Sequence, residues 1–420
     1  HGDMTSQLTV PLDGEMEPMS VVRALATDPD RGLRQRAYEA ELAAWKTVAM
    51  PLAAAMNGIK HETNVLMRRR GWDDPVDATC FHNAMDRATL EAMLTAAENS
   101  FPDFRRYLRA KAKLVSGADR LPWYDLFAPV GNESETWDWS TGTRFVAEQF
   151  DRYSAKMGDF ARTAFAGQWI DAEPRPGKRD GAYCMGVVPG VSRILQNYRP
   201  SFDGVSTLAH ELGHAYHNLC LKDRTPIQSS TPMTLAETAS IFCETIVKNA
   251  ALSQITDPGS RLAILEASLQ GSCQVVVDIT SRYRFEQAAL AGRRERDLSV
   301  DEMCHHMVEA QKSTYGDGLS DELHPFMWAV KGHYYGSTYY NYPYMFGLLF
   351  GLGLYARYQE DPDGFRAGYD DLLSSTGLAD AATLGARFGI DIRTEAFWTS
   401  SLDIVRADID QFVQLAEAAG

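Results

Sequence analysis

Apolar side chains recur at helical spacing along most of the chain. After Asp30, which can cap a helix, Leu33, Ala37 and Leu42 fall mostly on one helical face. Further helical patterns cover residues 78–97, 104–115, 143–165, 235–251, 260–289, 300–315 and a stretch from 344 to the C-terminus, with a break expected at 99–102 between the first two. The pattern therefore predicts a mainly α fold.

One stretch of the chain has strand character instead. Residues 182–188 and 192–198 suit two short strands, and Pro189 with Gly190 between them predicts a hairpin turn. Helical spacing resumes at about Asp203, a plausible N-cap for the helix that follows. We therefore expect one small β-sheet directly before that helix.

Composition and charge restrict the classes of function. The 420 residues are 45% hydrophobic and 23% charged, as in ordinary globular proteins. Lys and Arg number 41 and Asp and Glu 56, so the net charge of −15 argues against a nucleic-acid or membrane surface. The longest apolar run, residues 345–355, is too short to cross a bilayer. The six cysteines are widely spaced and no signal peptide is evident, so a cytoplasmic protein is expected.

The helix after the predicted hairpin carries the pattern H-E-x-x-H at residues 210–214. Residues four apart lie on the same side of a helix, so His210 and His214 can direct two imidazoles at one ion. Glu211 lies one residue further round, where it can reach a water molecule on that ion without being a ligand. This arrangement is typical of zinc peptidases, with two His ligands and a Glu general base.

A third ligand is expected in the next helical stretch, residues 235–251. Glu237, Ser240 and Glu244 fall at i, i+3 and i+7, which is one face of a helix. A solvated face is the simpler interpretation of such a stripe, but the preceding H-E-x-x-H pattern favours a metal site. We therefore predict Glu237 as the third Zn²⁺ ligand, with Ser240 and Glu244 orienting the histidines. Two His, one carboxylate and an open position are the catalytic pattern of zinc, not the structural one.

Several motifs resemble the oligoendopeptidase F branch of the thimet-oligopeptidase-like zinc peptidases. They are residues 207–215 (TLAHELGHA), 236–240 (AETAS) with Glu244, 324–335 (HPFMWAVKGHYY) and 339–347 (YYNYPYMFG). Weaker similarity at residues 69–72 and 121–126 extends the match over nearly the whole chain. The resemblance implies a multi-helix zincin-type metallopeptidase with a small sheet beside the active-site helix and a deep substrate cleft.

The resemblance also assigns roles in the C-terminal motifs. In this family a His and a Tyr from that region stabilise the oxyanion of the tetrahedral intermediate, and His333 and Tyr342 are the matching positions. Such donors are typically worth a few kcal/mol when they are aimed at the developing charge.

Other side chains in these motifs are expected to contribute less directly. Tyr335 and Tyr340 are candidates for substrate binding, and so is His324, for which a structural role is equally open. We expect Tyr339 and Tyr344 to pack in the aromatic core.

The strand at residues 192–198 matches the strand that edges the active site in this family. It is expected to bind an extended peptide by backbone pairing, with Arg193 and Gln196 as candidate substrate-binding residues. Gly186 and Gly190 would allow a second chain to approach closely.

Two parts of the chain are expected to form one continuous catalytic domain. Residues 1–130 form an N-terminal helical part and residues 131–420 the zinc catalytic part. Full-length relatives carry a further helical lobe upstream, which is expected to be absent here, so the limit on substrate size is left open.

The sequence therefore predicts a zinc-dependent endopeptidase that hydrolyses short peptides. One alternative is a zinc carboxypeptidase on a related scaffold, in which Arg193 or Lys331 would grip the terminal carboxylate of the substrate. A second is a non-catalytic peptide-binding relic, against which the intact Glu211 argues. The oligomeric state is not determined by these motifs.

Overall fold

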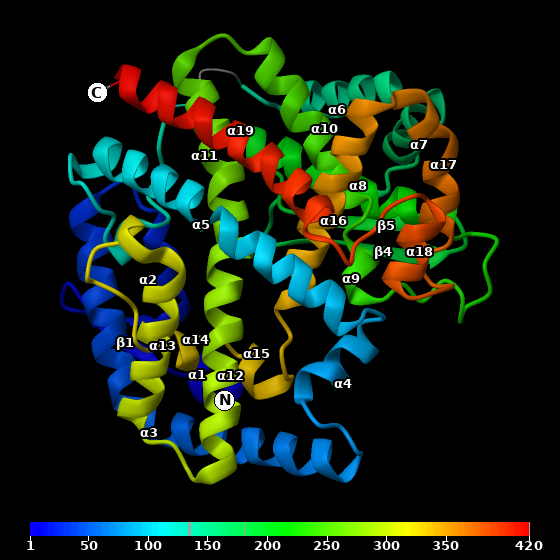
Figure 1. Cartoon of the computed structure of the whole chain (residues 1–420). Helices are drawn as coiled ribbons and strands as arrows, with labels where there is room; N and C mark the ends of the chain where they lie inside the picture. Colours follow the sequence, from blue (N-terminus) through cyan, green and yellow to red (C-terminus); the bar gives the residue numbers. More distant parts are fainter. Residues whose placement is uncertain (133–135, 180, 420) are drawn as a thin grey trace.

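Long helices begin where the sequence supplies a capping side chain. The structure is a computed structural model and describes residues 1–132, 136–179 and 181–419, which are mainly helical (Figure 1). Asp30 accepts a hydrogen bond from the Gly32 N–H at the start of α3 (Arg31–Arg69), as predicted. Asp86 caps α5 (Arg87–Ser116) in the same way, through the Thr89 N–H. These caps satisfy N–H groups that the first turn of a helix leaves without partners.

The predicted boundaries between residues 78 and 115 are wrong. The break lies earlier, between α4 (Pro75–His82) and α5, where Ala84 has a left-handed backbone with φ of 51°. No break occurs at 99–102, because Pro102 is exposed inside α5 while Phe101 and Phe104 are buried on either side of it. Packing of these rings outweighs the one helical hydrogen bond that a proline removes.

Two further helix starts differ from the sequence pattern. The predicted helix 143–165 is divided into α6 (Trp139–Tyr153) and α7 (Ala155–Ala166), because Ser154 is extended and its side chain caps α7. The helix that carries the H-E-x-x-H pattern is α8 (Phe202–Cys220), and its cap is Ser201 rather than Asp203.

The predicted β-hairpin is confirmed, and it lies against α8. It consists of β4 (Ala182–Val188) and β5 (Val191–Gln196), paired antiparallel. A two-residue strand, β3 (Ile170–Asp171), adds to β5 in parallel, so that the strand order is β3-β5-β4. β4 is therefore an edge strand and β5 the central strand of this sheet.

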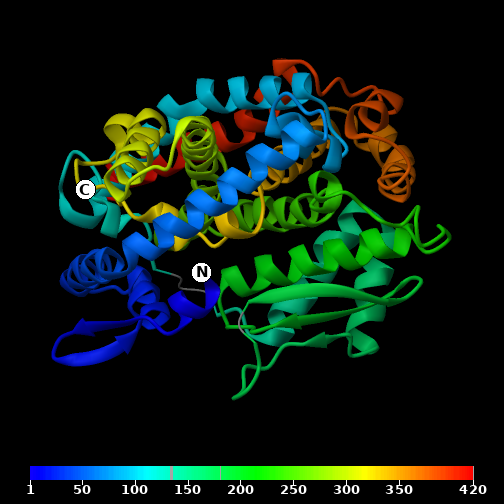
Figure 2. The same cartoon turned by 90° about the horizontal axis from the view of Figure 1, so that it is seen from below.

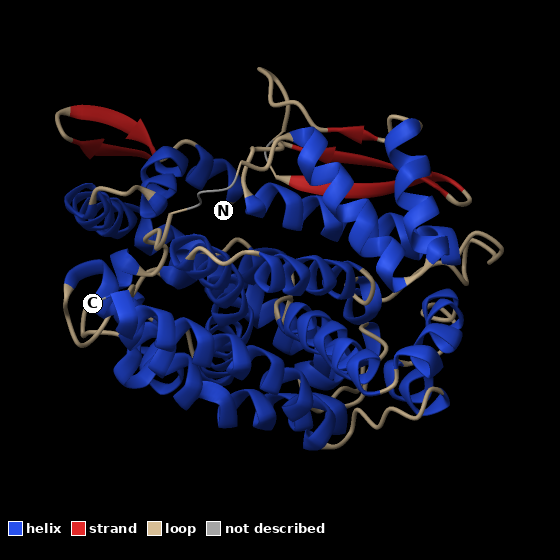
Figure 3. Cartoon of the chain, turned by 90° about the horizontal axis from the view of Figure 1, so that it is seen from above, coloured by secondary structure: helices blue, strands red, loops and turns tan. Residues whose placement is uncertain are grey.

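A second, two-stranded sheet near the N-terminus is not predicted by the sequence pattern. β1 (Thr9–Leu12) pairs antiparallel with β2 (Glu15–Pro18) around Asp13 and Gly14, both with positive φ. An Asp-Gly pair between short strands is a hairpin signal that could have located it. Figure 3 shows this hairpin at the opposite end of the molecule from the three-stranded sheet.

The remaining helices stack in layers above α8. In Figure 2 the order runs from the three-stranded sheet through α8, α10 and α16 to α19 and α5, and each neighbouring pair is in contact. The other α-helices are α1 (Gly2–Ser6), α2 (Met19–Ala24), α9 (Met233–Ala236), α10 (Ser240–Gln254), α11 (Pro258–Cys273), α12 (Ile279–Glu295), α13 (Val300–Tyr315), α14 (Met327–Val330), α15 (His333–Gly336), α16 (Tyr342–Glu360), α17 (Pro362–Ser374), α18 (Ala381–Arg387) and α19 (Glu395–Ala419).

A long helical stretch, Pro258–Glu295, runs through the centre of the molecule (Figure 1). It comprises α11, a π-helical segment at Gln274–Asp278, and α12. By length and composition alone it could cross a membrane, but 61% of its most apolar window is buried inside the protein. Such burial is expected of a core helix.

Candidate active site

Helix α8 presents two imidazoles side by side. His210 and His214 are one helical turn apart and their ring centroids are 4.9 Å apart. The opposite face of the helix is fixed by fully buried side chains, including Val205, Leu208 and Leu212. The apolar face of α8 therefore sets the direction of the histidine face.

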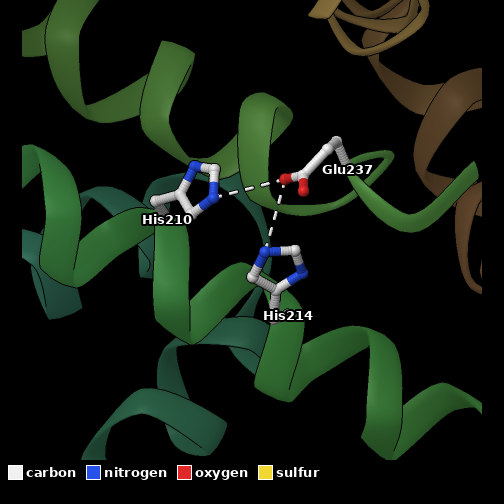
Figure 4. A group of neighbouring side chains, drawn as sticks. All are labelled: His210, His214 and Glu237. Atoms are coloured by element: carbon white, nitrogen blue, oxygen red, sulfur yellow. Dashed lines mark ion pairs between the residues drawn. The ribbon is translucent and has the colours of Figure 1, made fainter. Parts of the chain in front are cut away.

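The carboxylate of Glu237 lies between the two imidazoles, as Figure 4 shows. Its Oε2 atom is 3.3 Å from Nε2 of His210 and 3.3 Å from Nε2 of His214. The three candidate ligand atoms all lie within 4.8 Å of one another, and no other group of three such side chains is this close in the described part of the chain. The structure thus contains a candidate His-His-Glu metal site.

Glu237 is not on a continuous helix, so the predicted helix 235–251 is wrong. Glu237 follows the short helix α9, and α10 begins only at Ser240. The helical spacing of Glu237, Ser240 and Glu244 correctly predicted that these three side chains lie close together. Glu237 itself, however, lies in the break between the two helices.

Glycine residues bring the three elements of the site together. A Cβ atom on Gly213 of α8 would lie 2.6 Å from the Ser240 Cα and 2.7 Å from the Ala239 carbonyl oxygen. A Cβ atom on Gly347 of α16 would lie 2.8 Å from the Glu237 Cβ. Because no side chain fits at either position, the α9–α10 junction is held tightly between α8 and α16.

Gly213→Ala is expected to destabilise the fold by about 1–3 kcal/mol, because the new methyl group must displace the α9–α10 backbone. It should also weaken metal binding, since that backbone carries Glu237. Gly271→Ala in α11 is the matched control: its Cβ would meet nothing within 4 Å. The control should be neutral or stabilise by about 0.5–1 kcal/mol. Thermal unfolding and metal titration of both variants test this, and equal behaviour of the two would contradict it.

Two further polar side chains contact the candidate ligands. Oε2 of Glu244 lies 3.1 Å from Nδ1 of His210, and Oε1 of Glu244 accepts a hydrogen bond from the Ser206 hydroxyl at 3.2 Å. The Ser240 hydroxyl donates to Oε2 of Glu237 at 2.5 Å. Glu244 therefore orients a histidine as the spacing predicted, whereas Ser240 contacts the carboxylate and neither histidine.

The candidate ligands shift one another's pKa values. Burial lowers the pKa of His210, but hydrogen bonds and charge from Glu237 and Glu244 outweigh it and raise that pKa to about 10. Burial raises the pKa of Glu237, but His210 and His214 bring it well below its usual range. The carboxylate thus remains charged and the His210 imidazole serves as its counterion, a role that a bound cation would take over.

Glu211 lies beside this cluster with one oxygen that makes no hydrogen bond. The residue is 5% exposed and its Oε2 atom has no partner among the described residues. Burial raises the pKa of Glu211, opposed by the nearby His210 and His214. An unpaired buried carboxyl oxygen is unfavourable unless water, substrate or an ion satisfies it.

A cavity of about 410 Å³ opens over these groups. It is lined by His210, Glu211, His214 and Glu237, together with Ala182, Tyr183 and Cys184 of β4 and residues of the α8–α9 connection. The free edge of β4 therefore borders the candidate site.

The prediction that the strand 192–198 edges the site is wrong. It corresponds to β5, which is paired on both sides, by β3 and by β4. Gln196 is buried and donates to the Gly204 carbonyl at 2.7 Å, which anchors β5 to α8. Arg193 lies over the Trp169 ring and does not line the cavity. Neither side chain is placed to bind substrate there.

The hydroxyl of Tyr342 contacts residues in and next to α4. Its side chain is buried and its hydroxyl lies 3.3 Å from the Thr79 hydroxyl and from the Asn83 amide, both in or next to α4. His333 is partly exposed, and its Nδ1 lies 3.0 Å from Oδ1 of Asn341. The position predicted for an oxyanion donor at Tyr342 is thus occupied by a structural tyrosine.

Tyr344, expected in the core, is instead exposed near Glu237. Its hydroxyl lies 3.3 Å from that of Tyr340, whose ring lies against the His333 ring in a tilted arrangement with the centroids 4.7 Å apart. Burial, Tyr340 and the Glu237 carboxylate all raise the pKa of Tyr344. Gly347, three residues further along α16, packs on Glu237. The i, i+3 relation between Tyr344 and Gly347 is the sequence signal that could have found it.

The remaining predicted residues lie elsewhere. Tyr335 stacks on the His1 ring at 4.1 Å, and its hydroxyl has no hydrogen bond among the described residues. His324 is 1% exposed, with Nε2 3.4 Å from Oε1 of Glu41, and it lines a separate cavity with Lys331. For His324 the structural alternative is the one that fits.

Comparison with known sequences places the whole arrangement in a family. The sequence profile of peptidase family M3 matches residues 24–404. The chain is 23% identical to the chromosomal oligoendopeptidase F of Lactococcus lactis subsp. cremoris over 398 residues, 94% of this chain and 66% of that protein. It is 21% identical to oligopeptidase PepF of Bacillus subtilis, over 92% of this chain and 58% of the relative. The chain thus spans less than two thirds of the length of these curated relatives.

Solved structures share the fold. A putative peptidase from Chlamydophila abortus is 19% identical, with a TM-score of 0.87 over 98% of this chain and 70% of that chain. Oligoendopeptidase F from Enterococcus faecium is 17% identical, with a TM-score of 0.76 over 99% of this chain and 71% of that chain. The profile match covers most of the residues and includes the His-His-Glu cluster, so this chain belongs to peptidase family M3 and is oligoendopeptidase F-like.

Proposed function

We propose that this protein is a zinc-dependent endopeptidase that hydrolyses internal bonds of short peptides. The observation that carries the proposal is the convergence of His210, His214 and Glu237 beside the unpaired carboxyl oxygen of Glu211. The names of the similar bacterial proteins, oligoendopeptidase F and oligopeptidase, support peptides as substrates. A cytoplasmic location remains a prediction from the sequence.

The donor set fits zinc. Two imidazole nitrogens and one carboxylate oxygen are the ligands of many catalytic zinc sites, which keep a position open for water or substrate. Glu244 at Nδ1 of His210 and Ser240 at Oε2 of Glu237 hold the ligands in orientation. When bound, zinc would supply Lewis-acid activation of water and of the scissile carbonyl.

The chain's own residues would handle the proton and the substrate. Glu211 would accept a proton from the attacking water and return it to the leaving amine, because it lines this cavity beside the two histidines and its Oε2 atom has no partner among the described residues. The free edge of β4 would offer backbone N–H and C=O groups to an extended peptide. The hydroxyl of Tyr344 would donate to the developing oxyanion.

An end-blocked peptide separates this function from its alternatives. A quenched fluorescent peptide with both termini blocked should be cleaved internally by the zinc-loaded protein, and mass spectrometry should locate the cut. A carboxypeptidase would leave it intact and would need a cation near the site, whereas neither Arg193 nor Lys331 lines this cavity. Binding of peptides without any cleavage would overturn the proposal.

Tyr344→Phe is expected to lower kcat by about 100-fold with little change in KM, because the hydroxyl would act only on the transition state. Tyr342→Phe is the matched control, two residues away. Its hydroxyl contacts Thr79 and Asn83, so kcat should stay within about 3-fold of the wild type. Steady-state kinetics on the blocked peptide measure both, and the reverse order of effects would restore Tyr342 as the donor.

A further inference from the structure

A buried ion pair lies behind the C-terminal motif and is not used by the proposed chemistry. Lys60 of α3 and Glu286 of α12 are 1% and 2% exposed, and Nζ lies 2.5 Å from Oε1. Burying two charges is costly, and replacing such a pair by apolar side chains is often neutral or stabilising. A contribution to stability is therefore a weak explanation for the presence of this buried pair.

The second oxygen of Glu286 holds the backbone before α16. Its Oε2 accepts a hydrogen bond from the Tyr339 N–H at 3.1 Å. Tyr339 has a left-handed backbone with φ of 49°, an unusual conformation for a bulky side chain. Conformations of this kind persist where tertiary contacts impose them. Glu286 supplies one such contact, and the packing of the Tyr339 ring on Tyr283 supplies another.

Helix α12 holds the same segment at a second point. Arg282, one turn before Glu286, donates to Oδ1 of Asn341 at 3.3 Å, and that oxygen also accepts from Nδ1 of His333. One face of α12 therefore fixes Tyr339 and Asn341, two residues apart. Between them lies Tyr340, whose ring lies against the His333 ring and whose hydroxyl contacts that of Tyr344.

We propose that the Lys60–Glu286 pair is a positioning device for the active site. It holds Tyr339 in its left-handed conformation and thereby fixes Tyr340, whose hydroxyl contacts that of Tyr344 beside Glu237. Oε1 of Glu286 faces the Lys60 ammonium and Oε2 faces the Tyr339 N–H, so Lys60 fixes the orientation of the carboxyl group. The inference rests on the proposed function and extends it to residues that touch neither metal nor substrate.

Two double variants with the same net charge test the hydrogen-bond acceptor for the Tyr339 N–H separately from the buried charges. Lys60→Met/Glu286→Gln removes both charges but retains an oxygen for the Tyr339 N–H, whereas Lys60→Met/Glu286→Leu removes the acceptor as well. With the blocked peptide, the leucine variant should lose at least 10-fold in kcat, with KM and zinc content within 3-fold of the wild type. The glutamine variant should stay within 3-fold in kcat.

Hydrogen exchange provides a readout that does not depend on activity. Peptic fragments covering residues 338–346 should exchange at least 10-fold faster in the leucine variant and at the wild-type rate in the glutamine variant. Lys60→Met/Glu286→Met also lacks the acceptor and is closer in shape to the glutamine variant; it replaces the leucine variant if that protein does not fold, and it should shift both readouts in the same direction.

These measurements distinguish a failure of the positioning role from a failure of the proposed function. Equal kcat and equal exchange in the two double variants would overturn the positioning role, even if the wild type cleaves peptides. If the wild type binds zinc but cleaves no peptide, the proposed function fails. The exchange rates then still decide whether the pair fixes this segment.

Discussion

Replacing Glu211 by glutamine is expected to lower kcat by about 1000-fold or more while one zinc ion per chain is retained. Glu211 lines the same cavity as the two histidines, and its Oε2 atom has no partner among the described residues. A glutamine fills the same space but cannot accept the proton of the attacking water. Steady-state kinetics and metal analysis of the dialysed protein measure the two quantities.

Stability provides the control for this variant. Burial raises the pKa of Glu211, so a neutral side chain of the same shape should fit the fold at least as well. The melting temperature of Glu211→Gln is therefore expected to equal or exceed that of the wild type. Substantial peptide hydrolysis by a folded, zinc-loaded variant would remove Glu211 from the role of general base.

Glu237→Ala is expected to abolish stoichiometric zinc binding and to leave less than about 1% of the activity. The carboxylate is the one candidate ligand outside α8, so its loss leaves two imidazoles on a single helix. Added zinc at 100 times its Kd should stabilise the wild type by about 2.7 kcal/mol and the variant hardly at all. Metal analysis and thermal unfolding with and without zinc test both expectations.

Glu244→Gln is the matched control for the ligand variant. An amide oxygen at this position can still accept from Nδ1 of His210, so zinc affinity should fall by at most about 10–100-fold. If Glu237→Ala bound zinc as tightly as Glu244→Gln, the assignment of Glu237 as a ligand would be wrong.

The two imidazoles could be predicted because their arrangement is local. The spacing of His210 and His214 on a helix decides that they lie on one side, and the apolar residues of the same stretch decide which side faces the core. Glu237 does lie beside the two histidines, but the helix expected to carry it is interrupted. The break between α9 and α10 depends on the close approach of Gly213 and Gly347, which lie on other helices.

The sequence pattern could not decide which of two neighbouring tyrosines lies near the metal cluster. Tyr342 and Tyr344 are two residues apart on α16 and therefore point to nearly opposite sides. Which side faces the metal cluster depends on the rotation of α16, and Gly347 and Gly351 set that rotation by packing against Glu237 and Ile241. The resemblance to a family indicated the segment that contains both tyrosines but not which of them lies near Glu237.

The edge strand was misassigned for a similar reason. Both strands of the hairpin look alike in sequence, and only the pairing of β3 with β5 leaves β4 with the free edge. β3 has two residues, too few to give an alternating pattern.

The sequence alone specified the groups of the candidate site: a helix with two imidazoles and a carboxylate, a further glutamate downstream, and a tyrosine-rich segment near the C-terminus. Periodicity along one element is enough to specify these groups. Only the tertiary structure decided that β4 borders the cavity and that Tyr344, rather than Tyr342, lies near Glu237. Those outcomes depend on how separate elements pack at a few glycines and on one short strand, and such contacts leave no periodic trace in the chain.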